Sequence, residues 1–200
     1  MTMNIQPQTT QKLRDALNIT GFVVAVIVGA WLINLFVFRS FNVSGPSMEN
    51  TLHTGERLIV NRLSLTWDHI RGRQYVPDRG DIIVFKNPHF GPDMPDEYIV
   101  KRVIAFPGEF VETVNGKLVV YKNEQRENPI AVDDLYDGPQ GSTSASVSTV
   151  VPDGQIFVAG DHRQGGYSYD SRNGLGTIPY ADIIGPVIFR LFPFDKMRVF

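Results

Sequence analysis

An uncharged apolar run near the N-terminus most constrains how this chain can fold. It extends from Ile19 to Phe38 (ITGFVVAVIVGAWLINLFVF) and ends at Arg39. A helix of this length spans roughly 30 Å at about 1.5 Å per residue, which matches the hydrocarbon thickness of a bilayer. The run therefore predicts a transmembrane helix over residues 19–38, preceded by a short cytoplasmic segment over residues 1–18.

Two other interpretations of this run are weaker. A cleaved signal peptide has an apolar region of about 7–15 residues followed by a small-residue cleavage site, whereas this run is longer and no such site follows it. A buried core helix is rarely apolar on all of its faces. Lys12 and Arg14 outnumber Asp15 before the run, so the positive-inside rule favours a cytoplasmic N-terminus. Residues 39–200 would then lie on the extracytoplasmic side of the cell membrane.

Residues 39–200 carry the pattern of a mainly β domain. Short runs rich in valine and isoleucine, each bounded by turn-forming residues, predict strands. These runs are 57–60, 81–85, 98–105, 117–121, 155–159 and 183–191. Asn115-Gly116 predicts a tight hairpin, and no amphipathic helix of about 11 residues is visible after Phe38. The polar stretch 137–149 predicts a mobile loop, within a loop region or small insert around residues 110–152.

The composition excludes several kinds of function. The net charge of −2 supplies no basic surface for nucleic acid. The chain has no cysteine, which excludes disulfides, thiolate metal sites and a cysteine nucleophile. No histidine pair has the spacing of a zinc-binding helix. We therefore expect no metal, no organic cofactor and no nucleic-acid partner.

The first stretch that carries chemistry is Ser44–Leu52 (SGPSMENTL), just after the apolar run. Gly45 and Pro46 bend the chain, so Ser47 is expected on a turn. A serine becomes a nucleophile only when a base removes its proton. The four histidines are scattered and no G-x-S-x-G motif is present. A triad of Ser47 with His162 and Asp161 nevertheless stays open.

Lys101 is the better candidate for this base. It lies in the predicted strand 98–105, with apolar residues before and after it on both faces. Burial on an apolar face lowers the pKa of an amine from its ordinary value of about 10.4, and a neutral lysine accepts the serine proton directly. The ordinary alternative is a lysine at a sheet edge whose amine reaches water, beside an SGPS sequence that is only a turn.

Four motifs in this order resemble the bacterial type I signal peptidases, which are membrane-bound serine proteases with a serine–lysine dyad. They are residues 44–52, 79–85 (RGDIIVF), 101–109 (KRVIAFPGE) and 160–163 (GDHR) with 168–172 (SYDSR). The resemblance implies a strand-rich catalytic domain tethered by one transmembrane helix. It makes Ser47 the nucleophile and Lys101 the general base.

The resemblance also implies supporting roles. Ser168 would hydrogen-bond the Lys101 amine, Asp170 and Arg172 would form an ion pair, and Asp161 belongs to the same motif. Four features depart from the family. Gly45 stands where some members have a hydroxyl donor for the oxyanion, and Asn50 stands where proline is usual. His162 stands where asparagine is common, and two extra residues lie between Arg163 and Ser168. The walls of the substrate site are expected at Met48, Leu52, Ile99 and Val100.

The implied activity is removal of signal peptides from secretory preproteins after small residues, as in A-x-A sites. The expected partners are these preproteins and the lipid bilayer, and we expect a monomer. Two alternatives stay open. One is an organellar inner-membrane peptidase, and the other is a tethered β-domain that binds exported chains with little or no catalysis. A self-cleaving repressor of related fold is excluded, because 18 residues before the apolar run cannot hold a DNA-binding domain.

Overall fold

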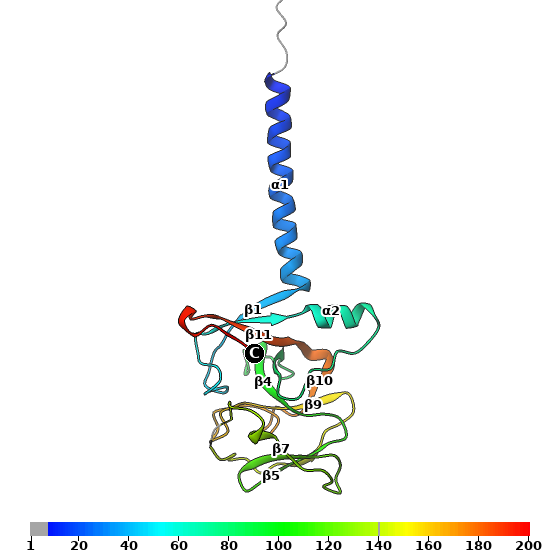
Figure 1. Ribbon diagram of the computed structural model, residues 1–200, viewed down its shortest axis with the longest axis vertical. Coiled ribbons are helices and arrows are strands. Elements are labelled where there is room, and N and C mark those ends of the chain that lie inside the picture. Colours follow the sequence, from blue (N-terminus) through cyan, green and yellow to red (C-terminus); the bar gives the residue numbers. More distant parts are fainter. Residues whose placement is uncertain (1–7, 140) are drawn as a thin grey trace, which may run out of the picture.

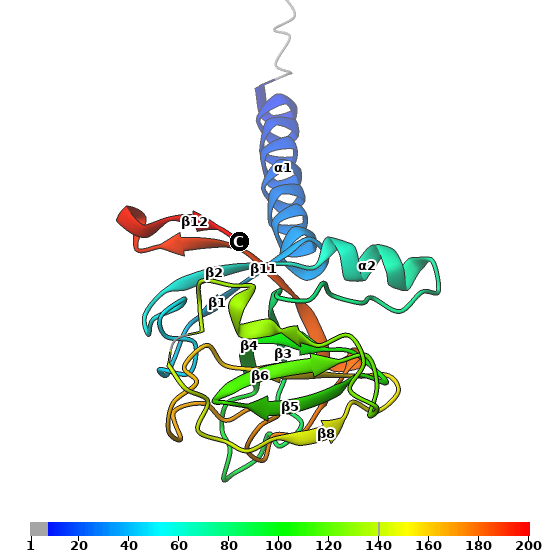
Figure 2. The ribbon, with the colours of Figure 1, turned by 60° about the horizontal axis from the view of Figure 1, so that its bottom comes forward.

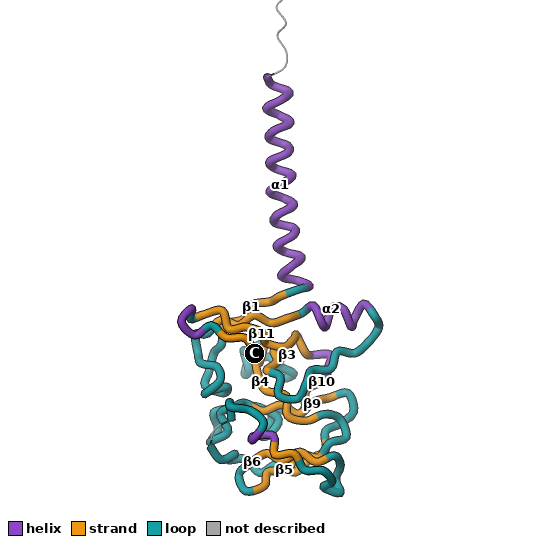
Figure 3. The backbone as a smooth tube through the Cα atoms, in the orientation of Figure 1, coloured by secondary structure: helices purple, strands orange, loops and turns teal. Residues whose placement is uncertain are grey.

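A single long helix projects from a body built mainly of strands (Figures 1 and 3). The computed structural model describes residues 8–139 and 141–200. The helix, α1 (Gln8–Phe36), is long and apolar enough to cross a membrane, and its apolar side chains are exposed. It ends two residues before the predicted boundary at Phe38, because Phe38 begins strand β1 (Phe38–Asn42) and pairs with Asn61.

The larger sheet organises the body. Its strands are all antiparallel and run in the order β1, β2, β11, β3, β4, β9, β10, with β12 paired to β11. Their bounds are β2 (Arg57–Asn61), β3 (Ile82–Lys86), β4 (Tyr98–Ala105), β9 (Gln155–Ala159), β10 (Ile178–Pro179), β11 (Ile183–Phe192) and β12 (Arg198–Val199). This order leaves β1 at one edge of the sheet and β4 near its middle.

Both faces of this sheet are buried at its middle strands, which explains their continuous apolar runs. In β3, Ile82 and Val84 belong to one core cluster, while Ile83 and Phe85 belong to another. Successive residues of a strand point to opposite faces, so an unbroken run of apolar residues supplies both clusters. The prediction of a mainly β fold is confirmed.

A smaller sheet lies at the end of the body remote from α1 (Figure 1), and Figure 2 shows its strands β5, β6 and β8 from that end. Its order is β7 (Ile130–Ala131), β6 (Lys117–Tyr121), β5 (Phe110–Val114) and β8 (Ser148–Val150). Asn115 and Gly116 join β5 to β6 with φ angles of 51° and 74°, as the hairpin prediction requires. All four strands of this sheet fall within residues 110–152, where we expected a mobile loop or a small insert. The mobility of residues 137–149 stays a prediction.

The structure adds short helices that the sequence pattern did not reveal. The helix α2 (Leu63–Ile70) follows β2 and lies beside the base of α1 (Figure 1). Three single-turn helices, η1 (Val132–Asp134), η2 (Tyr180–Asp182) and η3 (Phe194–Lys196), lie in the connections between strands that follow one another in the sequence. Each is shorter than the window over which helical periodicity can be recognised.

Candidate active site

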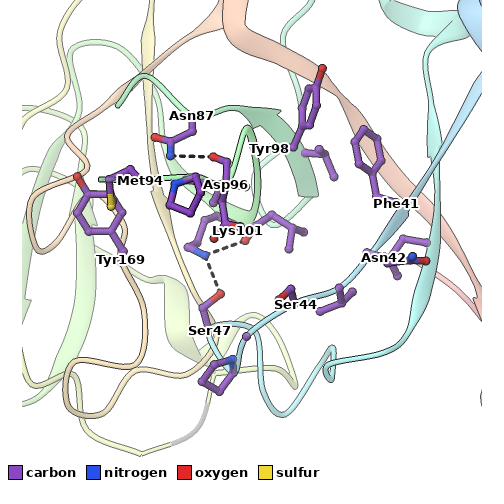
Figure 4. A pocket seen from close by; sticks show the side chains of 18 of the residues that line it. Phe41, Asn42, Ser44, Ser47, Asn87, Met94, Asp96, Tyr98, Lys101 and Tyr169 are labelled. Carbon is purple, nitrogen blue, oxygen red and sulfur yellow. Dashed lines mark hydrogen bonds between the residues drawn. The ribbon is translucent and has the colours of Figure 1, made fainter. Parts of the chain in front are cut away.

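Ser47 and Lys101 lie in hydrogen-bond contact. The Lys101 Nζ atom is 2.7 Å from the Ser47 Oγ atom and donates a second hydrogen bond to the Val100 carbonyl at 2.9 Å (Figure 4). The two residues are 54 positions apart in the sequence, so the fold brings them together. A nucleophile and a base at this distance form the minimal arrangement for general-base catalysis.

The turn that presents Ser47 is held by its neighbours in the core. Gly45 has a φ of +88°, which favours glycine, and it reverses the chain after β1. Met48 and Leu52 are both fully buried and pack beneath the sheet. We expected these two side chains to form walls of the substrate site; instead they anchor the turn, because apolar groups on its inner side gain most by burial.

Lys101 is buried because it lies in an apolar strand, as the sequence pattern predicted. It pairs with Ile83 in the middle of the large sheet, and only 3% of its surface is exposed. Burial lowers the pKa of Lys101 to about 8, while the negative charge of Asp170 acts in the opposite direction. At pH 7 the neutral amine is then a substantial minority species, on the order of one molecule in ten.

Asp170 forms a buried polar cluster beside the dyad. Its carboxylate accepts hydrogen bonds from the Arg172 guanidinium at 2.9 and 2.7 Å, the Gly160 N–H at 2.8 Å and the Ser168 hydroxyl at 2.5 Å. Burial alone raises the pKa of Asp170, but the hydrogen bonds and charge of Arg172 outweigh it and hold the pKa below its ordinary value. The ion pair expected between Asp170 and Arg172 is therefore present.

Ser168 is placed differently from our expectation. Its hydroxyl donates to Asp170, and no hydrogen bond joins it to the Lys101 amine among the described residues. It still lies close to the nucleophile's backbone: a Cβ atom on Gly160 would come within 2.2 Å of the Ser168 Oγ and 2.3 Å of the Ser47 carbonyl oxygen. Glycine at position 160 is thus required for these groups to approach one another.

The Asp161 carboxylate binds Arg102 and Thr51 rather than the neighbouring His162. The Arg102 guanidinium donates to both of its carboxylate oxygens, and the Thr51 hydroxyl donates to Oδ2. The His162 ring contacts the Pro46 carbonyl through Nδ1 at 3.2 Å. Within the described part of the chain, the alternative triad of Ser47, His162 and Asp161 is therefore not assembled.

Sequence reasoning missed Arg102 and Thr51, although both lie inside the motifs that were singled out. Arg102 follows Lys101 directly, and Thr51 lies in the stretch that carries Ser47. A charged residue in the middle of an apolar strand was the available signal, because a buried arginine requires an anionic partner.

A cleft of about 390 Å³ leads to the dyad between two strand edges. Among the described residues, β1 pairs only with β2, and β4 pairs with β9 only from Arg102 onward. In this part of the chain β1 and residues 98–100 of β4 therefore each leave one edge free. Ile99 and Val100 line the cleft, as expected. Besides Ser47 and Lys101, Figure 4 labels the lining residues Phe41, Asn42, Ser44, Asn87, Met94, Asp96, Tyr98 and Tyr169.

The cleft is bounded by aromatic rings that the sequence did not single out. Phe41 and Tyr98 pack with ring centroids 5.2 Å apart, and the Arg39 guanidinium lies 4.5 Å from the Tyr98 ring centroid. They come from the two strands whose edges are free. No group of three histidine, aspartate or glutamate side chains that could hold a metal ion occurs among the residues described by the structure.

Comparison with known proteins finds similar proteins that are named signal peptidase I. A signal peptidase I from Bacillus licheniformis is 34% identical over 96% of this chain and 97% of its own length. Signal peptidase I S from Bacillus subtilis is also 34% identical, over 97% of this chain and 98% of its own length. A crystal structure of a signal peptidase I from Enterococcus faecalis V583 is 26% identical, covers 56% of this chain and 97% of that chain, and gives a TM-score of 0.41.

The family described as "Signal peptidase, peptidase S26" matches residues 16–192, which include Ser47, Lys101, the smaller sheet and every strand of the larger sheet except β12. Because this match spans most of the chain and the relatives are aligned over nearly their whole length, the chain belongs to the signal peptidase family S26, a family of serine proteases.

Proposed function

We propose that this protein is a membrane-anchored endopeptidase that removes signal peptides from exported preproteins, with Ser47 as nucleophile and Lys101 as general base. The observation that carries the proposal is the 2.7 Å contact between Lys101 Nζ and Ser47 Oγ at a buried position. The curated relatives are named signal peptidase I, which supports the substrate class.

The chemistry follows from the protonation state of Lys101. A neutral amine takes the Ser47 proton as the Oγ atom attacks the carbonyl carbon of the scissile peptide bond. The resulting ammonium group gives that proton to the leaving amine, and the new N-terminus departs. Lys101, neutral again, then takes a proton from the water that attacks the acyl-enzyme. The bond between the acyl carbon and the Ser47 Oγ atom then breaks while the Lys101 ammonium returns its proton to Oγ, which releases the signal peptide with a new C-terminal carboxylate and restores both residues.

The negative charge that develops on the carbonyl oxygen needs a donor. The Ser47 N–H is suited to this task, because among the described residues it makes no backbone hydrogen bond within the turn. Gly45 contributes no hydroxyl, and its φ of +88° disfavours any residue that could supply one. We therefore infer that backbone N–H groups stabilise the oxyanion in this enzyme.

The free edges of β1 and β4 favour an extended peptide as substrate. A strand that adds to such an edge forms main-chain hydrogen bonds and turns alternate side chains toward the protein. Ile99 and Val100 offer an apolar surface beside the dyad. A confined apolar wall of this kind favours small side chains before the cleaved bond, as in an A-x-A site.

The helix α1 supports the membrane anchor. It carries Lys12 and Arg14 before its uncharged part, which favours a cytoplasmic N-terminus and an extracytoplasmic cleft. A preprotein held in the same bilayer by its own apolar segment would present its cleavage site near the membrane surface. An anchored protease meets such a site at a high effective concentration.

The proposal is tested by incubating the detergent-solubilised full-length protein with a preprotein that contains one Ala-x-Ala site. Mass spectrometry of the products should locate a single cut after the second alanine, and Ser47→Ala should abolish it. Ser148→Ala, which changes an exposed serine in β8, is the matched control and should cleave normally. A properly folded wild-type protein that binds the preprotein without cutting it would favour the non-catalytic alternative.

A further inference from the structure

The short helix α2 presents an apolar face that no other described part of the chain covers. Leu63, Trp67 and Ile70 are 51%, 52% and 71% exposed. Their spacing places them on one side of the helix, since residues three and four apart are neighbours on a helix surface. Leu65 lies on another side and packs against the core of the large sheet. α2 therefore turns a second apolar stripe outward.

Hydrogen bonds fix the start of α2 to the end of α1. The Arg62 guanidinium donates to the Leu35 carbonyl at 2.6 Å, and the Thr66 hydroxyl donates to the Phe36 carbonyl at 3.0 Å. The last carbonyls of a helix have no partner inside it, so these donors satisfy them. Figures 1 and 2 both show α2 lying crosswise beside the base of α1. Its position is thus set by the end of the apolar helix.

The length of the uncharged part of α1 gives the depth of this junction. From Ile19 to Phe36 the helix has no charged residue. At about 1.5 Å per residue this part measures roughly 27 Å, close to the ~30 Å of a bilayer's hydrocarbon core. Given the membrane anchor of the proposed function, on which this inference rests, Phe36 lies at the hydrocarbon boundary and α2 lies at the level of the lipid headgroups.

The side chains of α2 and of the two arginines that follow it suit that level. The Arg71 guanidinium lies 4.5 Å from the centroid of the Trp67 ring, and both Arg71 and Arg73 are exposed. Tryptophan is enriched at membrane interfaces because its ring is apolar and its N–H is polar. Exposed arginines beside it attract the anionic headgroups of a charged lipid surface. Asp68 is the only acidic residue in the helix.

We propose that α2 is an interfacial helix whose face of Leu63, Trp67 and Ile70 enters an anionic lipid surface. Arg71 and Arg73 then contact the phosphate groups. With α1 crossing the bilayer, this second contact holds the catalytic body in one orientation, so that the cleft stays at a fixed height above the membrane.

The chain's two tryptophans, Trp31 in α1 and Trp67 in α2, allow a direct test. The full-length Trp31→Phe variant is placed in vesicles of phosphatidylcholine and phosphatidylglycerol that contain lipids brominated close to the headgroup. The brominated lipids should quench Trp67 fluorescence. The quenching should be weaker in vesicles that contain the same brominated lipids but no phosphatidylglycerol. Arg71→Gln with Arg73→Gln should remove that difference between the two vesicles. Equal quenching of the parent variant in both vesicles would overturn the role of the arginines.

The companion variant Trp67→Phe reports on Trp31 and separates this inference from the anchor. If bromolipids quench Trp31 while Trp67 stays unquenched and open to aqueous acrylamide, the interfacial helix is overturned and the anchor stands. If Trp67 is shielded from both quenchers, a protein or a second copy covers the face, and the proposal fails. If Trp31 itself is not quenched, the anchor fails and this inference fails with it.

A second pair of variants tests the apolar face. Leu63→Ser with Ile70→Ser, made in the Trp31→Phe background, should reduce the quenching of Trp67, and the fold should persist because both side chains are exposed. Ile130→Ser is the matched control, since Ile130 is a 37% exposed residue of β7, at the end of the body remote from α1 (Figure 1). It should leave the quenching unchanged. Equal quenching in all three proteins would contradict the contact through this face.

Discussion

Arg102 donates hydrogen bonds to both carboxylate oxygens of Asp161, at 2.8 and 2.6 Å, in a buried ion pair. Arg102 follows Lys101 in β4, and consecutive residues of a strand point to opposite faces. Lys101 therefore contacts Ser47, while Arg102 joins β4 to the segment after β9 through Asp161. The same segment is hydrogen-bonded to the turn that carries Ser47, because the His162 N–H donates to the Ser47 carbonyl at 3.1 Å.

Asp161→Ala should destabilise the protein by about 3–5 kcal/mol, because it leaves the Arg102 guanidinium buried without its counter-charge. Urea unfolding of the full-length protein in detergent measures this loss. Asp134→Asn breaks an exposed ion pair with Lys117 and should not change the unfolding curve. A stable Asp161→Ala variant would show that the pair does not hold these segments together.

The charges beside Lys101 should shift its pKa in opposite directions. Asp170 stabilises the ammonium form and Arg172 destabilises it. Asp170→Asn should therefore lower the apparent pKa of the base and move the rise of activity to lower pH, whereas Arg172→Gln should move it to higher pH. The measurement is kcat/KM as a function of pH, with circular dichroism to confirm folding. Shifts of both variants in one direction would contradict this electrostatic account.

Gly45→Ser should lower activity although it introduces a hydroxyl near the nucleophile. The φ of +88° at this position costs a non-glycine residue about 1–2 kcal/mol, so the turn that presents Ser47 should distort. Gly108→Ser is the matched control, because Gly108 has a φ of +80° with equally open space but lies away from the dyad. Both variants should lose similar stability, and only Gly45→Ser should lose activity. An active Gly45→Ser enzyme would mean that a side chain at position 45 is compatible with the oxyanion site.

Lys101→Met should make the protein more stable at neutral pH. Burial lowers the folded-state pKa of Lys101 to about 8 from 10.5, so the unfolded chain binds more protons between these values and the lysine costs stability below them. The cost at pH 7 is about 3 kcal/mol, and it shrinks as pH rises from 8 toward 10.5. Thermal unfolding of both proteins across pH 7 to 10 measures the difference. A variant less stable than wild type at pH 7 would contradict the desolvation of this amine.

Periodicity alone predicted much of the sheet. The strands 98–105, 117–121 and 155–159 have the bounds that their apolar runs suggested. Asn115-Gly116 forms its hairpin because two consecutive positive φ angles suit these residues. Such features are local, so the sequence carries them without knowledge of the rest of the fold.

The remainder depends on contacts between distant segments. Met48 and Leu52 lie in a polar, turn-forming stretch, and only the fold shows that they point into the core. The very short strands β7, β10 and β12 exist because longer strands pair with them. The partner of Ser168 was inferred by resemblance, and the geometry gives its hydroxyl to Asp170 instead.

The pH dependence of kcat/KM for an Ala-x-Ala preprotein tests most directly whether Lys101 is the neutral base for Ser47. Activity should rise with an apparent pKa of about 8, since only the unprotonated amine can accept the serine proton. It should vanish at every pH in Lys101→Met and persist in Lys122→Met, which changes an exposed lysine. A rise centred near the histidine value of about 6.5, or substantial cleavage by Lys101→Met, would contradict the account.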